Sequence, residues 1–223
     1  MTVLLEATVD IKPIAARSLD HFIELYTTNE APELDRHGYE LVGAWRRSGG
    51  PLNRITHLYR FESLARYVDI RDSVRGDARF LALMPKYLEA PITLTEVITL
   101  GTTPAWYDDA KLSKALGESP AEPRQYVLAI VQIPMKGAAK AHELLARNVG
   151  HAEDAGGFQM VAAYEPVAGR RGELKVIGIF PMGLPPMAYQ AGAPDPPDLE
   201  ILREVVPEEE VYYLNPLPYS PLQ

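Results

Sequence analysis

The chain has 223 residues, of which 47% are hydrophobic and 23% charged, the composition of a soluble globular protein that can bury a sizeable core. Its 22 Lys and Arg against 30 Asp and Glu give a net charge of −8, which argues against nucleic acid or an anionic membrane surface as the main partner. The absence of cysteine excludes a disulfide scaffold, thiolate metal sites, iron–sulfur clusters and a cysteine nucleophile.

The sequence pattern matches neither a secretory signal nor a membrane-spanning segment. The N-terminal residues lack the basic region and long apolar core of a secretory signal. Apolar runs such as residues 127–131 have the length of a strand, well short of the roughly 20 residues that cross a bilayer. We therefore expect a soluble, cytoplasmic protein with no membrane partner.

The first hundred residues alternate between strand-like and helix-like patterns. The apolar periodicity predicts strands at 3–11, 39–47, 53–61 and 92–100, and helices at 15–26 and 64–87, the second with a break near Gly76. A strong turn at residues 48–51 joins the two middle strands. The order βαββαβ is the ferredoxin-like arrangement.

The remainder predicts a second, diverged unit of the same kind. We expect a ferredoxin-like half over residues 1–103, a linker with a short helix over 104–124, and a second half over 125–223. Prolines between residues 181 and 197 interrupt the second helix of that half, because proline is not tolerated in a helix interior. The proline-rich tail from residue 216 to 223 is expected to lie extended over a partner or to be disordered.

An internal repeat supports this division. Residues 41–61 align without a gap with residues 160–180, pairing Gly50 with Gly169, Phe61 with Phe180 and Trp45 with Tyr164. The repeat indicates an ancient duplication, although two unrelated hairpins would share some of this composition. The predicted fold is α+β, with two tandem ferredoxin-like repeats. Their bare sheet faces could close a barrel-like chamber, either within one chain or between two chains.

The polar side chains of the repeat are concentrated in its first copy. In the first hairpin stand Asn53, Arg54, His57 and Arg60, whereas the aligned positions of the second are Gly172, Glu173, Val176 and Ile179. His57 alternates with Ile55, Tyr59 and Phe61, so these four share one face of the sheet. An imidazole among aromatic rings can be kept neutral by desolvation and can take a proton near pH 7. A hydrogen-bonded structural histidine is the alternative.

Charged groups near this hairpin could complete a site. If arginines such as Arg46, Arg47 and Arg71 point into the chamber, they could hold a carboxylate, enolate or phenolate oxygen, whereas a solvated salt-bridge ladder is the alternative. Glu6 and Glu96 could pair with them or act as bases. No pair of histidines has metal-ligand spacing, and no phosphate-binding or dinucleotide motif is present.

The stretch from Gly43 to Arg71 resembles the NIPSNAP family of the dimeric α+β barrel superfamily. The resemblance is carried by Gly43-Ala44-Trp45, by Gly49-Gly50-Pro51-Leu52-Asn53, by His57-Leu58-Tyr59-Arg60-Phe61, and by Ser63 and Arg71. Tyr59 replaces the usual tryptophan, and Tyr67 holds the place of the first of two arginines. The resemblance implies a barrel fold and a homodimer.

The wider superfamily resembles a set of small-molecule sites that includes cofactor-independent oxygenases, isomerases, cyclases and lyases, which is an argument by analogy. Our leading hypothesis is an acid/base enzyme acting in the chamber on an apolar or aromatic oxygenated metabolite, without an organic cofactor or metal. The candidate catalytic residues are His57, Asn53 and Arg71. The candidate substrate-binding residues are Trp45, Tyr59, Phe61, Arg60 and Tyr164. The alternatives are a non-catalytic carrier or partner-binding scaffold and, third, a haem-dependent protein.

Overall fold

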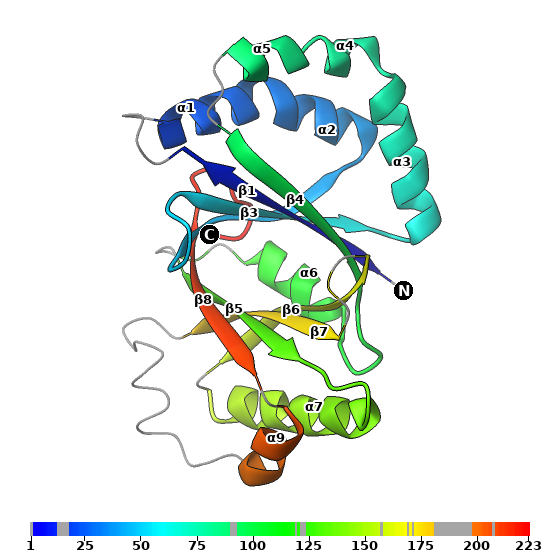
Figure 1. Ribbon diagram of the computed structural model, residues 1–223, viewed down its shortest axis with the longest axis vertical. Coiled ribbons are helices and arrows are strands. Elements are labelled where there is room, and N and C mark those ends of the chain that lie inside the picture. The colour runs from blue at the N-terminus through cyan, green and yellow to red at the C-terminus, as the bar shows by residue number, and fades with distance from the viewer. Residues whose placement is uncertain are drawn as a thin grey trace.

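The computed structural model contains a closed barrel of eight strands with helices on its outside (Figure 1). It describes residues 2–12, 18–89, 93–118, 120, 124–156, 158–168, 170, 172–180, 198–206 and 208–223. The strands are β1 (Val3–Ile11), β2 (Glu40–Ser48), β3 (Arg54–Phe61), β4 (Thr93–Thr102), β5 (Gln125–Gln132), β6 (Gln159–Ala168), β7 (Glu173–Phe180) and β8 (Glu209–Pro216).

Helices cover the outer face of each half of the barrel (Figure 1). The first half carries α1 (Ser18–Leu25), the π-helical segment η1 (Tyr26–Glu30), α2 (Ala31–His37), α3 (Leu64–Gly76), α4 (Ala78–Leu81) and α5 (Met84–Glu89). The second half carries α7 (Ala138–Asp154) and α9 (Leu199–Val205). Between the two sheets lies α6 (Ala110–Gly117), which is the short helix expected in the linker.

The barrel closes within one chain. Its strand order is β1-β3-β2-β8-β5-β7-β6-β4, and β4 pairs back with β1. The two halves meet at short antiparallel seams, where residues 45–48 of β2 pair with β8 and residues 100–102 of β4 pair with β6. The predicted α+β fold of two ferredoxin-like halves is therefore confirmed. Since both halves come from one chain, closure needs no second copy, and the homodimer stays a prediction.

The strand registers support the duplication. In the first half the pairing of β2 with β3 shifts between Leu41 and Gly43. In the second half the pairing of β6 with β7 shifts between Met160 and Ala162, the positions that the gapless alignment places opposite them. A β-bulge changes which face each following side chain takes. Its recurrence at matched positions is therefore stronger support for a common origin than shared hairpin composition.

Two sequence predictions differ from the structure. The helical region predicted to end near residue 26 continues through η1 and α2 to His37, where Gly38 ends it in the left-handed conformation at φ 93°. The tail, expected to lie over a partner or to be disordered, packs on its own chain: the backbone amide of Leu217 donates to the carbonyl of Ala44 at 2.9 Å, and Leu222 is 1% exposed. The proline run over 181–197 lies outside the described residues.

The barrel interior is a packed core. Its buried side chains include Leu4, Trp45, Leu58, Tyr126 and Tyr164, together with residues of α6. Separate apolar clusters lie between the first sheet and its helices and between the second sheet and α7. The expected open chamber between the two sheets is therefore filled by side chains.

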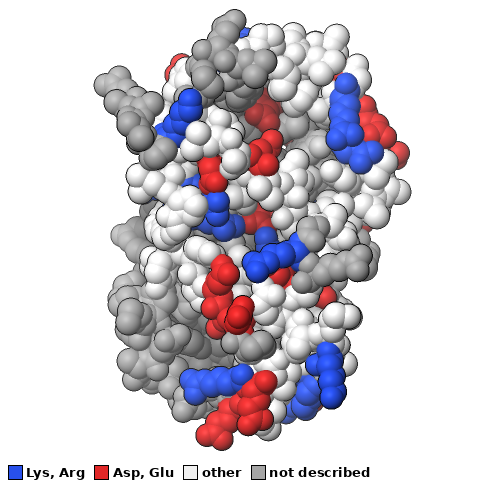
Figure 2. All heavy atoms as spheres, viewed as in Figure 1, with Lys and Arg blue, Asp and Glu red and all other residues white. Residues whose placement is uncertain are grey.

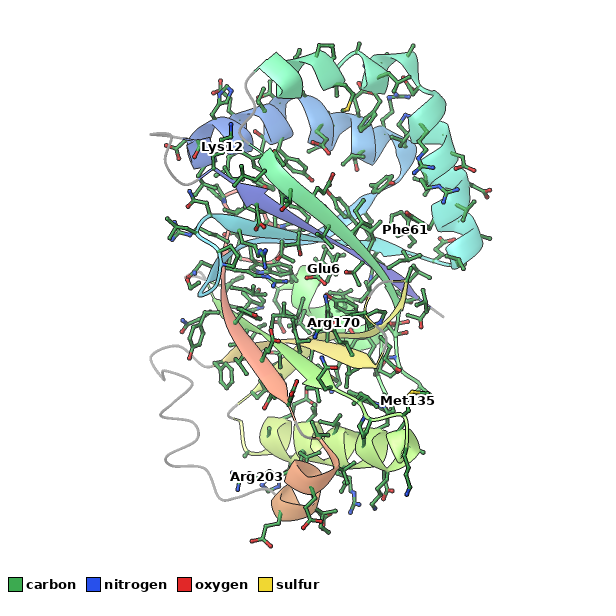
Figure 3. All side chains as sticks on the ribbon, in the orientation of Figure 1. Glu6, Lys12, Phe61, Met135, Arg170 and Arg203 are labelled. Atoms are coloured by element: carbon green, nitrogen blue, oxygen red, sulfur yellow. The ribbon has the colours of Figure 1, made fainter. Side chains whose placement is uncertain are left out.

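One buried carboxylate joins the two sheets inside the barrel (Figure 3). Glu6 on β1 accepts from Nη2 of Arg47 at 2.5 Å through Oε1, and through Oε2 from Nζ of Lys175 and the hydroxyl of Tyr164. Burial alone would raise the pKa of Glu6, but the two cations hold that pKa below its usual value. The pairing of Glu6 with an arginine, expected from the sequence, is confirmed, whereas Lys175 was not anticipated.

Replacing the carboxylate of this network and replacing one of its cations should change the free energy of unfolding by different amounts. Replacing Glu6 with Gln leaves two buried cations without a counter-ion and should lower the free energy of unfolding by about 3–5 kcal/mol. Replacing Lys175 with Met leaves the Glu6–Arg47 pair intact and should cost much less. Urea unfolding of both variants at pH 7 checks this, and equal losses would contradict the described role of Glu6.

Candidate active site

A pocket of about 410 Å³ lies outside the barrel, between the outer face of the first sheet and the helices that cover it. Pockets that bind small molecules usually have volumes of 300–1,000 Å³ and mostly apolar linings. The apolar lining comes from β1, β4 and the helices, and includes Leu5, Ala7, Val9, Phe22, Leu34, Val74, Phe80, Met84 and Ile98. The pocket therefore lies elsewhere than the sequence analysis expected, which put the site in the chamber between the two sheets.

His57 lies on the floor of the pocket, and the strand register explains why there is room above it. Its partner on β1 is Ala7 and its partner on β2 is Ala44. Because both neighbours carry only a methyl group, aromatic rings from other elements can lie over the imidazole. Tyr26 stacks on His57 with ring centres 4.5 Å apart and an interplanar angle of 14°.

His57 is a buried, neutral histidine. It is 2% exposed, and its Nε2 lies 2.7 Å from the hydroxyl of Tyr219. Burial lowers the pKa of His57 to about 3, because the cation would lose its hydration. The imidazole is therefore uncharged at any physiological pH in the unliganded protein.

Two phenols extend the polar end of the pocket. The hydroxyls of Tyr26 and Tyr59 lie 2.8 Å apart in the interior, and burial raises the pKa of both, so both remain protonated. Tyr26 opens the π-helical segment η1 and Glu30 ends it, and both line the pocket. π-helical turns are uncommon and are often found at functional sites.

Charged groups line other parts of the pocket. From α3 come Arg71 and Arg75, one helical turn apart, and from β4 comes Glu96. Arg71 also pairs with Asp72 at 2.7 Å and lies 5.9 Å from the ring of Tyr67. Although Glu96 keeps exposed surface, partial desolvation raises its pKa above the usual value.

Of the candidate catalytic and substrate-binding residues, the pocket brings three together, His57, Tyr59 and Arg71, and it adds Glu96, which the sequence suggested as a possible base. Asn53 is not among them. It is at the exit of the β2–β3 turn with φ 58°, a left-handed conformation that asparagine tolerates, and its carbonyl accepts from the amide of Ile11.

Two selected residues point away from His57 because of strand parity. Trp45 pairs with Thr56, the neighbour of His57, so it faces the barrel interior. The indole ring covers Gly43 so closely that a Cβ atom there would lie 1.9 Å from it. Tyr164 also faces the interior, where its hydroxyl donates to Glu6 at 3.0 Å.

The remaining two lie near the site without lining the pocket. Arg60 takes the opposite face from His57 and is paired with Glu40. Phe61 shares the face of His57, as predicted, but packs edge-on against Tyr39 and Tyr67 in the surrounding core.

Sequence reasoning missed several groups of this site. The sequence predicts Tyr26 only as part of the apolar stripe of a helix, and Tyr219 only as part of a tail that lies over a partner or is disordered. A signal for the tail was present, since Leu217, Tyr219 and Leu222 are large apolar residues in a short segment. Arg75 follows Arg71 by one helical turn, a spacing that places both on one face.

The described residues contain no cluster of three or more His, Asp or Glu side chains that could hold a metal ion. For an axial haem ligand, Nε2 of His57 would have to leave the hydroxyl of Tyr219. Charges on the viewed surface are mixed: Figure 2 shows acidic and basic side chains interspersed, with no continuous patch of either sign.

Comparison with known structures places the whole chain in one fold class. A candidate monooxygenase from Fusobacterium nucleatum is 8% identical, with a TM-score of 0.63 over 97% of this chain and 92% of that one. An anthrone oxidase-like protein is 16% identical, with a TM-score of 0.60 over 100% of this chain and 94% of that one. The protein therefore has the fold of the dimeric α+β barrel class.

The family assignment concerns the first half. Residues 12–100 match the model of the NIPSNAP family, which confirms the resemblance seen in this part of the sequence. A NIPSNAP domain protein from Burkholderia xenovorans, 18% identical, covers 49% of this chain and 100% of its own, with a TM-score of 0.42. No curated protein matches the chain.

No helix within the described residues combines the length and apolar character needed to cross a membrane.

The burial of His57 predicts a specific pH dependence of stability. Below about pH 6.5 the unfolded chain binds a proton at this residue, whereas the folded chain does not until the pH nears 3. As the pH is lowered below about 6.5, the free energy of unfolding should therefore decrease by about 1.4 kcal/mol per pH unit because of this group. Between pH 7 and pH 5 the wild type should lose about 2 kcal/mol more than His57→Gln.

Urea unfolding at the two pH values measures this difference. His21→Gln, a substitution on α1 outside the pocket, is the matched control and should keep the full loss. An identical loss in His57→Gln and wild type would show that His57 is not held neutral by burial.

Proposed function

We propose that the protein is an enzyme that acts on an apolar or aromatic oxygenated metabolite in the pocket between the first sheet and its helices. The observation that carries the proposal is one apolar pocket that holds a neutral histidine, a pair of phenols and a carboxyl group of raised pKa. Groups whose surroundings push their pKa values apart are typical of acid/base sites.

In the proposed reaction, Glu96 acts as the general base and His57 contacts the oxygen of the substrate. A general base works best when its pKa lies near the working pH. The pKa of His57 near 3 is far below that range, whereas desolvation moves the pKa of Glu96 towards it. The registers of β4, β1 and β3 put the two residues about 12 Å apart at the backbone, a span that a fused-ring ligand can bridge with side chains at both ends.

An oxygenase reaction fits these roles. Glu96 takes a proton from a ring CH₂ that a carbonyl group acidifies, and His57 holds the oxygen on which the negative charge collects. The carbanion reduces dioxygen and combines with it, and Glu96 returns the proton to the peroxide. Loss of water then leaves a second carbonyl, so that one CH₂ and one O₂ give one C=O and one H₂O. The likeness to an anthrone oxidase-like protein and a candidate monooxygenase supports this class of reaction by analogy of fold.

Dioxygen uptake with anthrone at pH 7 tests the proposal. Glu96→Gln and His57→Gln should each lower the rate above background by about 100-fold or more, the usual contribution of acid/base groups. Glu62→Gln, which changes an exposed carboxylate outside the pocket, should leave the rate unchanged. Uptake that is equal in wild type and both site variants would overturn the catalytic roles.

A ligand carrier without catalysis is the second candidate. It is favoured by the internal pairing of the polar groups, since Tyr26 binds Tyr59 and His57 binds Tyr219. A carrier would be stabilised against heat by anthrone or by neutral polycyclic phenols without consuming dioxygen, and the two readouts together separate it from an enzyme.

A further inference from the structure

The C-terminal tail is fixed to the first half of the chain by several hydrogen bonds. The amide of Leu217 donates to the carbonyl of Ala44, and the amide of Ala44 donates to the Ser220 hydroxyl, both at 2.9 Å. The Ser220 hydroxyl in turn donates to the carbonyl of Leu222, whose side chain is buried with the barrel interior. The segment that ends the second half is therefore anchored on the edge of β2, next to His57.

This anchoring delivers one phenol to the site. Tyr219 packs against Tyr26 with ring centres 5.0 Å apart and against His57 with ring centres 5.8 Å apart. Its hydroxyl lies 2.7 Å from Nε2 of His57. Among the described residues, no other group lies within hydrogen-bond distance of that hydroxyl.

Two arrangements of this hydrogen bond are compatible with its length, because each nitrogen of the imidazole is a donor or an acceptor according to the tautomer. If Nε2 of His57 carried the proton and donated it, the phenolic hydrogen of Tyr219 would have no acceptor among the described residues. If Tyr219 donates to Nε2, the single imidazole proton is on Nδ1, which has no acceptor among the described residues, and this proton can be donated to a ligand in the pocket. The other groups that face the imidazole are the phenols of Tyr26 and Tyr59, while Glu30 and Glu96 line the same pocket.

We propose that the tail is part of the active site: Tyr219 is a positioning residue that donates to Nε2 of His57 and thereby presents Nδ1–H to an acceptor oxygen of the ligand. The inference rests on the proposed function, which requires a donor at the substrate oxygen, whereas the state of the histidine is measured without a ligand. It names a carbonyl or phenolate oxygen as the group that the pocket recognises at His57.

The first experiment reads the imidazole directly. In protein labelled with ¹⁵N-histidine, the His57 ring, identified by its loss in His57→Gln, should show its proton on Nδ1 in the wild type at pH 7. Tyr219→Phe keeps the aromatic ring and removes only the hydroxyl, so the proton should redistribute between the two ring nitrogens. Tyr212→Phe, which removes an equivalent hydroxyl from β8 outside the site, should leave the spectrum unchanged.

A second measurement tests the ligand side. Anthrone and 9,10-dihydroanthracene have the same rings, but only anthrone carries an acceptor carbonyl. Wild type should bind anthrone more tightly, and Tyr219→Phe should reduce that preference by about fivefold, the effect of weakening one hydrogen bond.

The outcomes separate the two proposals. A wild-type proton on Nε2, or a spectrum that Tyr219→Phe does not change, overturns the role of the tail whatever the pocket binds. If the proton is on Nδ1 and moves in Tyr219→Phe while neither compound binds, the role of the tail is supported and the proposed ligand class fails.

Discussion

The arrangement of the barrel depends on how Glu6 is accommodated between two sheets. A buried carboxylate is tolerated only when cations and hydrogen-bond donors surround it. Here Arg47 comes from the first half, and Lys175 and Tyr164 come from the second. A one-residue slip of any of these strands would turn its side chain to the opposite face. The network therefore couples the two halves in a single register, which also determines what faces the helices.

Alternate residues of each strand face opposite sides of the first sheet, and the two faces have different roles. On β3, Thr56 faces the barrel interior and its hydroxyl accepts from Nε of Arg47, whereas His57 faces the helices and the pocket. The interior face supports the fold, and the outer face carries the groups suited to chemistry. The second half has the same bulged hairpin, with Val176 at the position of His57, and there it packs in the core beneath α7. The asymmetry of the polar residues thus corresponds to a difference of role on the same scaffold.

The sequence was sufficient to predict the strands, the two-part architecture and the face shared by His57, Tyr59 and Phe61, because these depend on local periodicity. It was not sufficient to place Trp45, since a bulge at Gly43 decides which face that side chain takes. Nor could it separate a site in the chamber from one under the helices, because both faces of a barrel sheet are apolar. Tyr219 was missed for a different reason: its contact joins residues 162 positions apart.

The segments that follow β4 and β8, the last strands of the two halves, each cross to the other half. After β4 the chain crosses to the second half, where the indole nitrogen of Trp106 donates to Nδ1 of His142 at 3.2 Å. After β8 the tail crosses to the first half, where Tyr219 reaches His57. The end of the second half therefore reaches a histidine whose pocket is lined by residues of the first half.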